Sequence, residues 1–166
     1  LLTLINDILD LSKIESGRMT LVSRTMSLDK IADKVEMLMR PQTDEKNITF
    51  ELKRDYVRPI VVGDELRLSQ ILINIAGNAL KFTHENGKIT VRIQEVYSDN
   101  KAARIKFSIK DNGIGISRED QKKIFIAFEQ AGQNSSSKYG GTGLGLAISN
   151  NFVHLMGGKL EVQSEL

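Results

Sequence analysis

Three polar side chains fall on one side of a predicted helix near the middle of the chain. Asn74, Asn78 and Lys81 are spaced i, i+4 and i+7 within ELRLSQILINIAGNALKFT, so a helix places them together. Asparagine is a poor residue for a helix interior, so two of them need an explanation. An amide oxygen can ligate Mg²⁺ and a lysine can meet a phosphate, although a solvated polar stripe would have the same spacing.

A second stretch, DNGIGIS (111–117), follows a predicted strand. Its glycines would let the backbone approach a flat ligand closely, and the Asp111 carboxylate can accept a hydrogen bond from a donor such as an exocyclic amine. Asp-Asn-Gly is also ordinary turn chemistry, so this stretch alone leaves both interpretations open.

A third stretch, KYGGTGLGLAISN (138–150), places four glycines within six positions directly ahead of a predicted helix. Bare amides at a helix N-terminus can face an anion, and glycines also serve as a hinge. A P-loop is excluded because Leu146 stands where its lysine is needed. The dinucleotide fingerprint is excluded as well, because Leu146 replaces its third glycine and a loop, not a strand, precedes it.

The elements that position these residues follow from hydrophobic periodicity. Asp64 is predicted to cap the helix that carries the amides, and a hairpin is predicted over 88–97 and 103–111. The apolar residues of that helix form one predicted buried face: Leu68, Ile71, Leu72, Ile75, Ala79 and Leu80.

Further elements complete the prediction. One helix starts at Ser27 and runs towards Arg40, where Pro41 is expected to help end it. The remaining elements are strands at 48–52, 59–64 and 159–164, a short helix over 118–128, and a helix over 143–156. Since they lack a regular βαβ rhythm, they favour a mixed sheet with helices covering one face.

The N-terminal segment has a different pattern. Leu1, Leu4, Ile8 and Leu11 are spaced 3-4-3, which predicts a coiled-coil or four-helix-bundle face that ends near Gly17. Ile5, Leu9 and Ile14 widen this stripe. A helix this short is marginal alone, so we expect it to pack on a partner outside the chain; the alternative is a helix folded back on the core.

Composition bounds the function. The 166 residues suit one domain of ordinary size, and a net charge of +2 gives no reason to expect nucleic acid or an anionic membrane as a partner. The absence of cysteine excludes disulfides and thiolate metal sites. The opening LLTLIND has neither an initiator methionine nor a signal-peptide layout, so we expect an excised fragment.

Taken in order, the motifs are far more specific than any one of them. QILINIAGNALKFT, DNGIGI, IFIAFEQ and GGTGLGLAI resemble the N box, first glycine box, F box and second glycine box of sensor histidine kinases. MGGKLEVQS resembles the segment that follows, and LINDILDLSKIESGRMTL resembles the end of the second dimerisation helix. The resemblance implies a dimerisation-helix segment at 1–18 and a catalytic ATP-binding (HATPase_c, GHKL) domain at 19–166, truncated before its last strand.

The fold that this resemblance implies is the Bergerat fold, an α/β (α+β) two-layer sandwich with a mixed β-sheet. Asn78 would then be the Mg²⁺ ligand, Lys81 would lie towards the ATP phosphates, and Asp111 would accept from the adenine amine. Gly113 and Gly115 would let the chain pass close to the base, and Ile116 belongs to the same motif.

The resemblance also implies a lid. The lid would turn onto the phosphates through five residues: Gly141, Thr142, Gly143, Leu144 and Gly145. Lys138 lies in the same loop, and Gln130 is expected near the γ-phosphate. Phe125 and Phe128 would anchor the front of the lid and dock the helix that carries the target histidine, although by composition alone they suit a core; Ala127 stands where related boxes have proline.

The implied function is transfer of the ATP γ-phosphoryl group to a histidine on a dimerisation helix, for relay to a response regulator receiver domain. The whole protein would be a cytoplasmic or membrane-anchored homodimer. Neither His84 nor His154 matches a phosphoacceptor, and no Ser-His-Glu-Leu-Arg element is present. Related ATPases place a water-activating glutamate where Asn74 stands, and an amide cannot take that proton, which disfavours an ATPase. An inactive nucleotide-sensing module is the remaining alternative.

Overall fold

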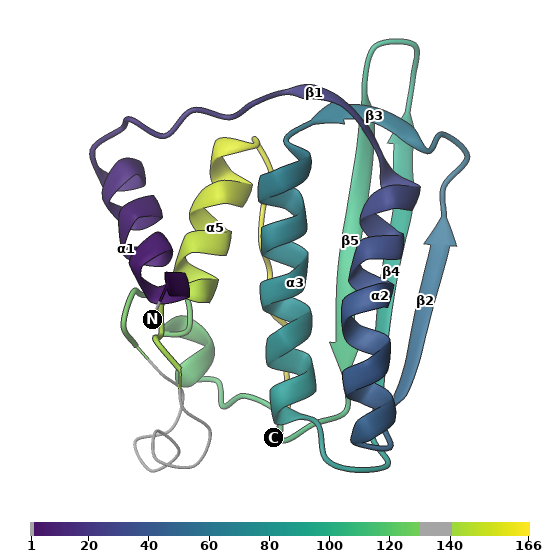
Figure 1. Cartoon of the computed structure of the whole chain (residues 1–166), viewed down its shortest axis with the longest axis vertical. Helices are drawn as coiled ribbons and strands as arrows, with labels where there is room; N and C mark the ends of the chain where they lie inside the picture. Colours follow the sequence, from purple (N-terminus) through teal and green to yellow (C-terminus); the bar gives the residue numbers. More distant parts are fainter. Residues whose placement is uncertain (1, 130–140) are drawn as a thin grey trace. The chain divides into compact units, whose positions relative to one another are not determined.

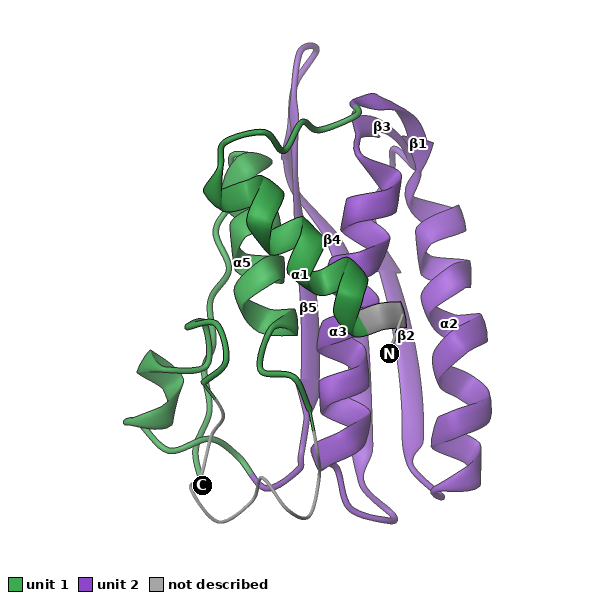
Figure 2. Cartoon of the chain, turned by 60° about the vertical axis from the view of Figure 1, so that its left-hand side comes forward, with its two compact units in different colours: residues 1–22, 115–166 green, residues 23–114 purple. Residues whose placement is uncertain are grey.

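The structure is a computed structural model, and it describes residues 2–129 and 141–166, with side chains from residue 4. The chain divides into two compact units (Figure 2): residues 23–114 form one, and residues 1–22 with 115–166 form the other. Within the described ranges, none of the helices combines the length and apolar character needed to cross a membrane.

Residues 23–114 contain a three-stranded sheet in the order β2–β4–β5. Strand β2 (Thr49–Asp55) runs parallel to β4 (Lys88–Ser98), which pairs antiparallel with β5 (Ala103–Asp111). Helices α2 (Leu28–Glu45) and α3 (Glu65–Phe82) lie side by side over one face of this sheet (Figure 1). Alternate residues of β4 explain why: Ile89, Val91 and Ile93 are fully buried against the helices. The predicted mixed sheet with one covered face is confirmed.

A smaller two-stranded sheet in the same unit pairs β1 (Arg24–Ser27) antiparallel with β3 (Ile60–Gly63). Strand β3 was predicted, but β1 was not. Its four residues include a single apolar side chain, that of the buried Met26, so its sequence carries no alternation from which a strand could be recognised.

Helix α2 passes through Pro41, so the predicted end at that residue is wrong. Proline removes one backbone donor, but side chains supply hydrogen bonds to the carbonyls around it. The Gln42 side chain donates to the Leu38 carbonyl at 2.7 Å. The Thr43 hydroxyl lies within hydrogen-bond distance of two carbonyl oxygens, that of Met39 at 3.1 Å and that of Arg40 at 2.9 Å. Because Thr43 is fully buried, the core also holds the turn that follows the proline.

Helix α3 begins and ends as predicted. The Asp64 carboxylate caps it by accepting from the Arg67 backbone N–H at 3.0 Å. The predicted apolar face faces the core, with Ile71, Leu72, Ala79 and Leu80 buried. This burial fixes the rotation of the helix, and therefore the side to which its amides point.

The other unit contains α1 (Leu2–Glu15) and α5 (Gly145–Leu155), which pack against each other. Among the side chains that the structure describes on α1, Leu4, Leu11 and Ile14 are half-buried, whereas Ile5, Ile8 and Leu9 are exposed. Helix α1 therefore contacts α5 and still presents apolar side chains to solvent, and its packing on a partner outside the chain stays a prediction.

Two predicted elements of this unit are wrong. The helix predicted over 118–128 is reduced to one 3-10 turn, η1 (Asp120–Lys122), and Phe128 has a positive φ of 68° that no helix continues through. Residues 159–164 form no strand, because alternation alone does not supply a ladder partner. Instead the Ser164 hydroxyl accepts from the Ile116 backbone N–H at 2.9 Å.

Candidate functional site

The polar side of α3 holds the first group of predicted site residues. Asn74, Asn78 and Lys81 are all half-buried, so each is partly shielded from water and still reachable. The Lys81 ammonium lies over the Phe82 ring, 4.8 Å from its centroid, which keeps the cation at the last turn of the helix.

The loop after β5 lies directly against this last turn of α3. The Ile114 backbone N–H donates to the Phe82 carbonyl at 3.3 Å. A Cβ on Gly113 would lie 2.3 Å from the Phe82 carbonyl oxygen, so only glycine fits there without moving the backbone. The structure thus joins two sequence motifs that are about thirty residues apart, as the difference between 82 and 113 shows.

Asp111 is exposed at the end of β5, and its orientation is fixed by one hydrogen bond. Its Oδ1 accepts from the Gly113 backbone N–H at 2.9 Å. A carboxylate carries two oxygens with about four acceptor positions, so acceptor capacity remains for a ligand donor.

Asn112 is a positioning residue that the sequence analysis missed. The Asn112 side-chain oxygen accepts from the Lys88 backbone N–H at 2.7 Å. The Asn112 backbone N–H donates in turn to the Lys88 carbonyl at 3.3 Å. These bonds continue the β4–β5 ladder by one residue and so fix where Asp111 ends the strand. The Asp-Asn-Gly signal was present, but its partner strand could not be assigned from the sequence.

The second group of predicted residues belongs to the other unit. Gly115 has a φ of +73°, and a Cβ there would lie 1.9 Å from the Glu165 carbonyl oxygen. Ile116 is held by its N–H bond to Ser164, while the Gln121 side chain donates to the Ile116 carbonyl at 2.8 Å and to that of Ser164 at 2.9 Å. The end of the first glycine motif is therefore a fixed turn.

Phe128 and the glycine loop meet within this unit. The Phe128 backbone N–H donates to the Gly143 carbonyl at 3.0 Å. Gly143 has a φ of +71°, and a Cβ there would lie 2.9 Å from the Phe128 Cα. The Phe128 side chain itself is 66% exposed, whereas Phe125 is half-buried. Phe128 is therefore not the core residue that composition suggests, and its docking role stays a prediction.

The glycine loop leads into the N-terminus of α5. The Thr142 hydroxyl accepts from the Leu144 backbone N–H at 3.2 Å, and Leu144 is fully buried. Leu144 is the N-cap residue and Gly145 the first residue of α5, so the cap position carries a side chain without any acceptor. Gly141 and Thr142 are exposed; Gln130 and Lys138 lie outside the described residues.

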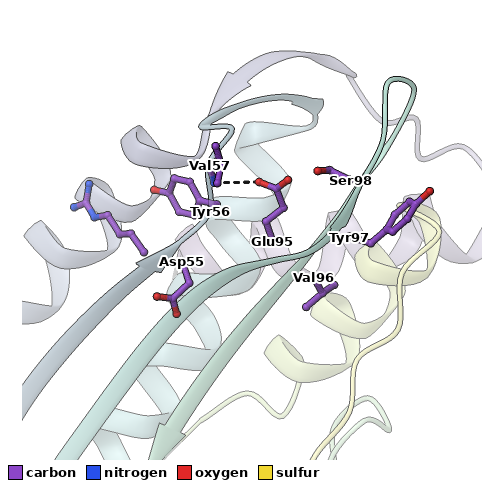
Figure 3. Close-up of a pocket in the computed structure, with 8 residues that line it drawn as sticks. Asp55, Tyr56, Val57, Glu95, Val96, Tyr97 and Ser98 are labelled. Atoms are coloured by element: carbon purple, nitrogen blue, oxygen red, sulfur yellow. Dashed lines mark hydrogen bonds between the residues drawn. The ribbon is translucent and has the colours of Figure 1, made fainter.

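A hollow of about 480 Å³ is lined by residues 54–57 and by residues 95–98 of β4 (Figure 3). It lies at the other end of β4 from Asp111, because Asp111 pairs with Ile89 at the start of that strand. The Glu95 carboxylate accepts from the Val57 and Arg58 backbone N–H groups at 3.1 and 3.2 Å. Burial and a hydrogen bond to Asp29 raise the pKa of Tyr56 to about 12. Glu95 and Tyr56 are therefore hydrogen-bonded within the protein, and their bonds hold the turn after β2. We accordingly interpret the hollow as part of that turn.

The donor set bears on metal binding. No group of three or more His, Cys, Asp or Glu within residues 2–129 and 141–166 could hold a metal ion. A divalent ion in this part of the chain would therefore take at most two ligands of these four residue types, with amide or carbonyl oxygens, phosphates or water supplying the others. Mg²⁺ is the ion that is usually bound in this way.

Comparisons with known proteins agree with this geometry. The family model described as "Histidine kinase-, DNA gyrase B-, and HSP90-like ATPase" matches residues 63–166. The signal transduction histidine-protein kinase BarA of Escherichia coli K12 is 42% identical over 167 residues, covering 99% of this chain and 18% of BarA. Hybrid signal transduction histidine kinase B of Dictyostelium discoideum is 40% identical over 99% of this chain and 8% of its own length.

Solved structures show the same relationship. Full-length ShkA in complex with AMPPNP has a TM-score of 0.77 at 31% identity, covering 98% of this chain and 34% of that one. The catalytic domain of the histidine kinase ThkA has a TM-score of 0.67 at 28% identity, with 80% and 82% covered. ThkA in complex with the response regulator protein TrrA has a TM-score of 0.68 at 25% identity, with 94% and 42% covered.

These matches define the class of protein. The chain belongs to the family of histidine kinase-, DNA gyrase B- and HSP90-like ATPases, and within it is an ATP-binding catalytic domain of the sensor histidine kinase type. It spans less than a fifth of the length of BarA, to which it is similar throughout.

Proposed function

We propose that this domain binds ATP with Mg²⁺ and transfers the γ-phosphoryl group to a histidine on a helix outside the 166 residues. A receiver-domain aspartate would then accept the phosphoryl group. The observation that carries this proposal is the contact of the Asp111–Ile114 loop with the last turn of α3, because it joins an acceptor for a base to a cation for phosphates. The ShkA complex with AMPPNP and the ThkA complex with TrrA support the nucleotide and the receiver-domain partner.

Asp111 would recognise adenine. Its carboxylate accepts hydrogen bonds only, so it suits the adenine amine and repels the carbonyl that guanine has in its place. Gly113 and Gly115 would allow the main chain to pass beside the base, with Ile116 held at the same turn by Ser164.

The Asn78 amide oxygen would hold Mg²⁺, and Lys81 one turn further along α3 would meet the phosphates. When bound, the ion supplies neutralisation of the phosphate charge. The half-buried position of both side chains supports this, because shielding from water strengthens their electrostatic effect. Phosphoryl transfer asks the protein mainly for such positioning and charge neutralisation.

The glycine loop would close the site. The first amides of α5 lack an accepting side chain at the N-cap position, so they suit an anionic phosphate. Gly141, Thr142 and Gly143 would form the approach to this helix, with Leu144 as its buried anchor. Lys138 and Gln130 would complete the loop near the γ-phosphate.

Asn74 disfavours simple ATP hydrolysis. An amide cannot take a proton from water at neutral pH, so the site has no general base at the position that the related ATPases use. Phosphoryl transfer would therefore require a nucleophile that another helix presents. Asn74 would act by orienting polar groups around the ion.

The whole protein is proposed to be a cytoplasmic-facing homodimer. The exposed stripe of Ile5, Ile8 and Leu9 on α1 supports a helical partner, because a bundle would bury these three side chains. No contact with nucleic acid or membrane is proposed for the 166-residue chain, since its net charge is only +2.

The proposal is tested with γ-labelled ATP, Mg²⁺ and a separately purified helix bundle that carries a phosphoacceptor histidine. We expect label on the bundle as an acid-labile, alkali-stable adduct, and no label on this chain alone. Asn78→Ala should abolish the transfer, while the exposed substitution Lys34→Met should leave it intact. Rapid phosphate release, or label on His84 or His154, would contradict the proposal.

A further inference from the structure

The end of α2 is tied to the end of α3 by four hydrogen bonds, which we call the α2–α3 clamp. It consists of Lys46, Asn47 and Thr49 on one side and Leu80 with residues 85–87 on the other. The Asn47 side chain donates to Glu85 at 2.9 Å, and its carbonyl accepts from the Asn86 N–H at 3.1 Å. The Thr49 N–H donates to the Gly87 carbonyl at 2.9 Å. These three bonds join one turn to another.

The fourth bond is different, because it reaches the helix itself. The Lys46 ammonium donates to the Leu80 carbonyl at 3.0 Å across 34 positions of sequence. Helix α3 ends just beyond: the Thr83 N–H and hydroxyl both donate to the Ala79 carbonyl, and Thr83 is extended with ψ 132°. The next carbonyl, that of Leu80, thus accepts from the Lys46 ammonium. A cation at this position also suits the negative end of the helix dipole.

The bonded carbonyl belongs to the turn that carries the site. Leu80 directly precedes Lys81, and two residues later the Phe82 carbonyl accepts from Ile114 and packs against Gly113. A shift of this turn would therefore move Lys81 and the Asp111–Ile114 loop relative to each other. A displacement of about 1 Å at a reacting group can cost on the order of a hundredfold in rate.

We propose that Lys46 is a positioning residue for the nucleotide site. It fixes the last turn of α3, and through Phe82 it sets the place of Gly113 and Asp111. Neither helix α2 nor its C-cap residue Lys46 belongs to the predicted ATP-contacting motifs. The positioning role of Lys46 is therefore additional to those motifs. The proposal rests on the proposed function only in taking Lys81 and Asp111 as nucleotide ligands.

Two substitutions separate positioning from general stability. Lys46→Met keeps a long apolar side chain but removes the donor and the charge, whereas Lys46→Arg keeps both. Lys34→Met, at an exposed position of α2, the helix that Lys46 follows directly, is the matched control. If Lys46→Met fails to fold, Lys46→Ala replaces it, because alanine also removes both the donor and the charge.

The 166-residue chain of each variant is titrated with an ATP analogue and with GTP, both with Mg²⁺, and amide exchange at Ile114 is followed in parallel. For Lys46→Met we expect about three- to tenfold weaker binding of the ATP analogue, a smaller preference over GTP, and faster exchange at Ile114. Lys46→Arg should stay within about twofold of wild type, and Lys34→Met should equal it.

Wild-type affinity, base preference and Ile114 exchange in folded Lys46→Met would overturn the proposal. A loss in Lys46→Arg as large as in Lys46→Met would overturn it as well, because the donor would then be irrelevant. Equal affinity of the wild type for ATP and GTP would instead contradict the role of Asp111. Exchange at Ile114 would still report on the clamp in that case.

Discussion

The two glycine loops of the chain meet different physical demands. Gly113, after β5, needs space: a Cβ would overlap the carbonyl of Phe82 in a packed helix. Gly143, before α5, needs conformation: its φ of +71° is one that side chains rarely adopt, and its contact is with the loop backbone of Phe128. The first loop is therefore shaped by the core beneath it, and the second by its own backbone.

This difference indicates which of the two loops is set by the folding of the core. Asp111 and Gly113 are held through their neighbours: Asn112 bonds to Lys88 of β4, and the Ile114 N–H donates to the Phe82 carbonyl at the end of α3. Both partners belong to the sheet and helix that form the core. The Gly141–Gly145 segment is held by Leu144 and the start of α5. Substitution of Gly113 should consequently affect folding and binding together.

The largest effect is expected for Gly113→Ala. Because the added carbon would meet helix backbone at 2.3 Å, the free energy of unfolding should fall by about 2–3 kcal/mol. Urea unfolding measures this loss, and ATP-analogue affinity should fall with it. A change within about 0.5 kcal/mol, the range of ordinary surface substitutions, would show that the loop yields easily and would remove the contrast.

Asp111→Ala should affect binding rather than folding. Loss of the acceptor leaves the adenine amine unpaired, so ATP affinity should fall by about ten- to a hundredfold, or roughly 1–3 kcal/mol. Asp111→Asn is the matched control for the fold, since its amide oxygen can still accept from the Gly113 N–H. Calorimetric titration with ATP and GTP gives both constants, and equal losses for the two nucleotides would contradict base recognition.

The comparison of Gly143→Ala with Gly157→Ala separates the contact with Phe128 from the conformational demand. Both glycines have nearly the same φ, +71° and +73°, but only Gly143 has backbone within 4 Å of the added carbon. Each substitution should cost about 1–2 kcal/mol in unfolding free energy from the left-handed backbone. Gly143→Ala should cost more because of Phe128, and equal melting temperatures for the two variants would show that contact to be irrelevant.

The smallest effect should have the opposite sign. Gly77 lies inside α3, and nothing is within 4 Å of an added carbon. Gly77→Ala should therefore raise the free energy of unfolding by about 0.5–1 kcal/mol through helix propensity. Denaturant unfolding provides the measurement, and a destabilised variant would indicate a packing demand at this position.

The elements with strong periodicity were predictable from the sequence. The cap at Asp64, the span of α3 and the β4–β5 hairpin follow from local patterns, and so does the shared side of Asn74, Asn78 and Lys81. Features that depend on distant partners were not. The passage of α2 through Pro41 depends on the burial of Thr43 in a core built from distant segments, in addition to the local side-chain donors Gln42 and Thr43.

The same reason explains the missed parts of the site. Lys46 and Leu80 are 34 positions apart, and no local pattern links a lysine after one helix to a carbonyl of the next. The strand predicted over 159–164 had the right alternation, but the formation of a strand is decided by a partner. Local chemistry therefore supplied the residues that are proposed to act, and tertiary structure identified those that hold them, such as Asn112 and Lys46.

The most direct test of this account is the Mg²⁺ dependence of nucleotide binding. An ATP analogue is titrated into wild type and Asn78→Ala, each with Mg²⁺ and with EDTA. We predict that EDTA weakens wild-type binding by about tenfold or more, and that Asn78→Ala shows equally weak binding in both buffers while its melting temperature is retained. Wild-type affinity that is unchanged by EDTA would contradict the assignment of Asn78 to the ion.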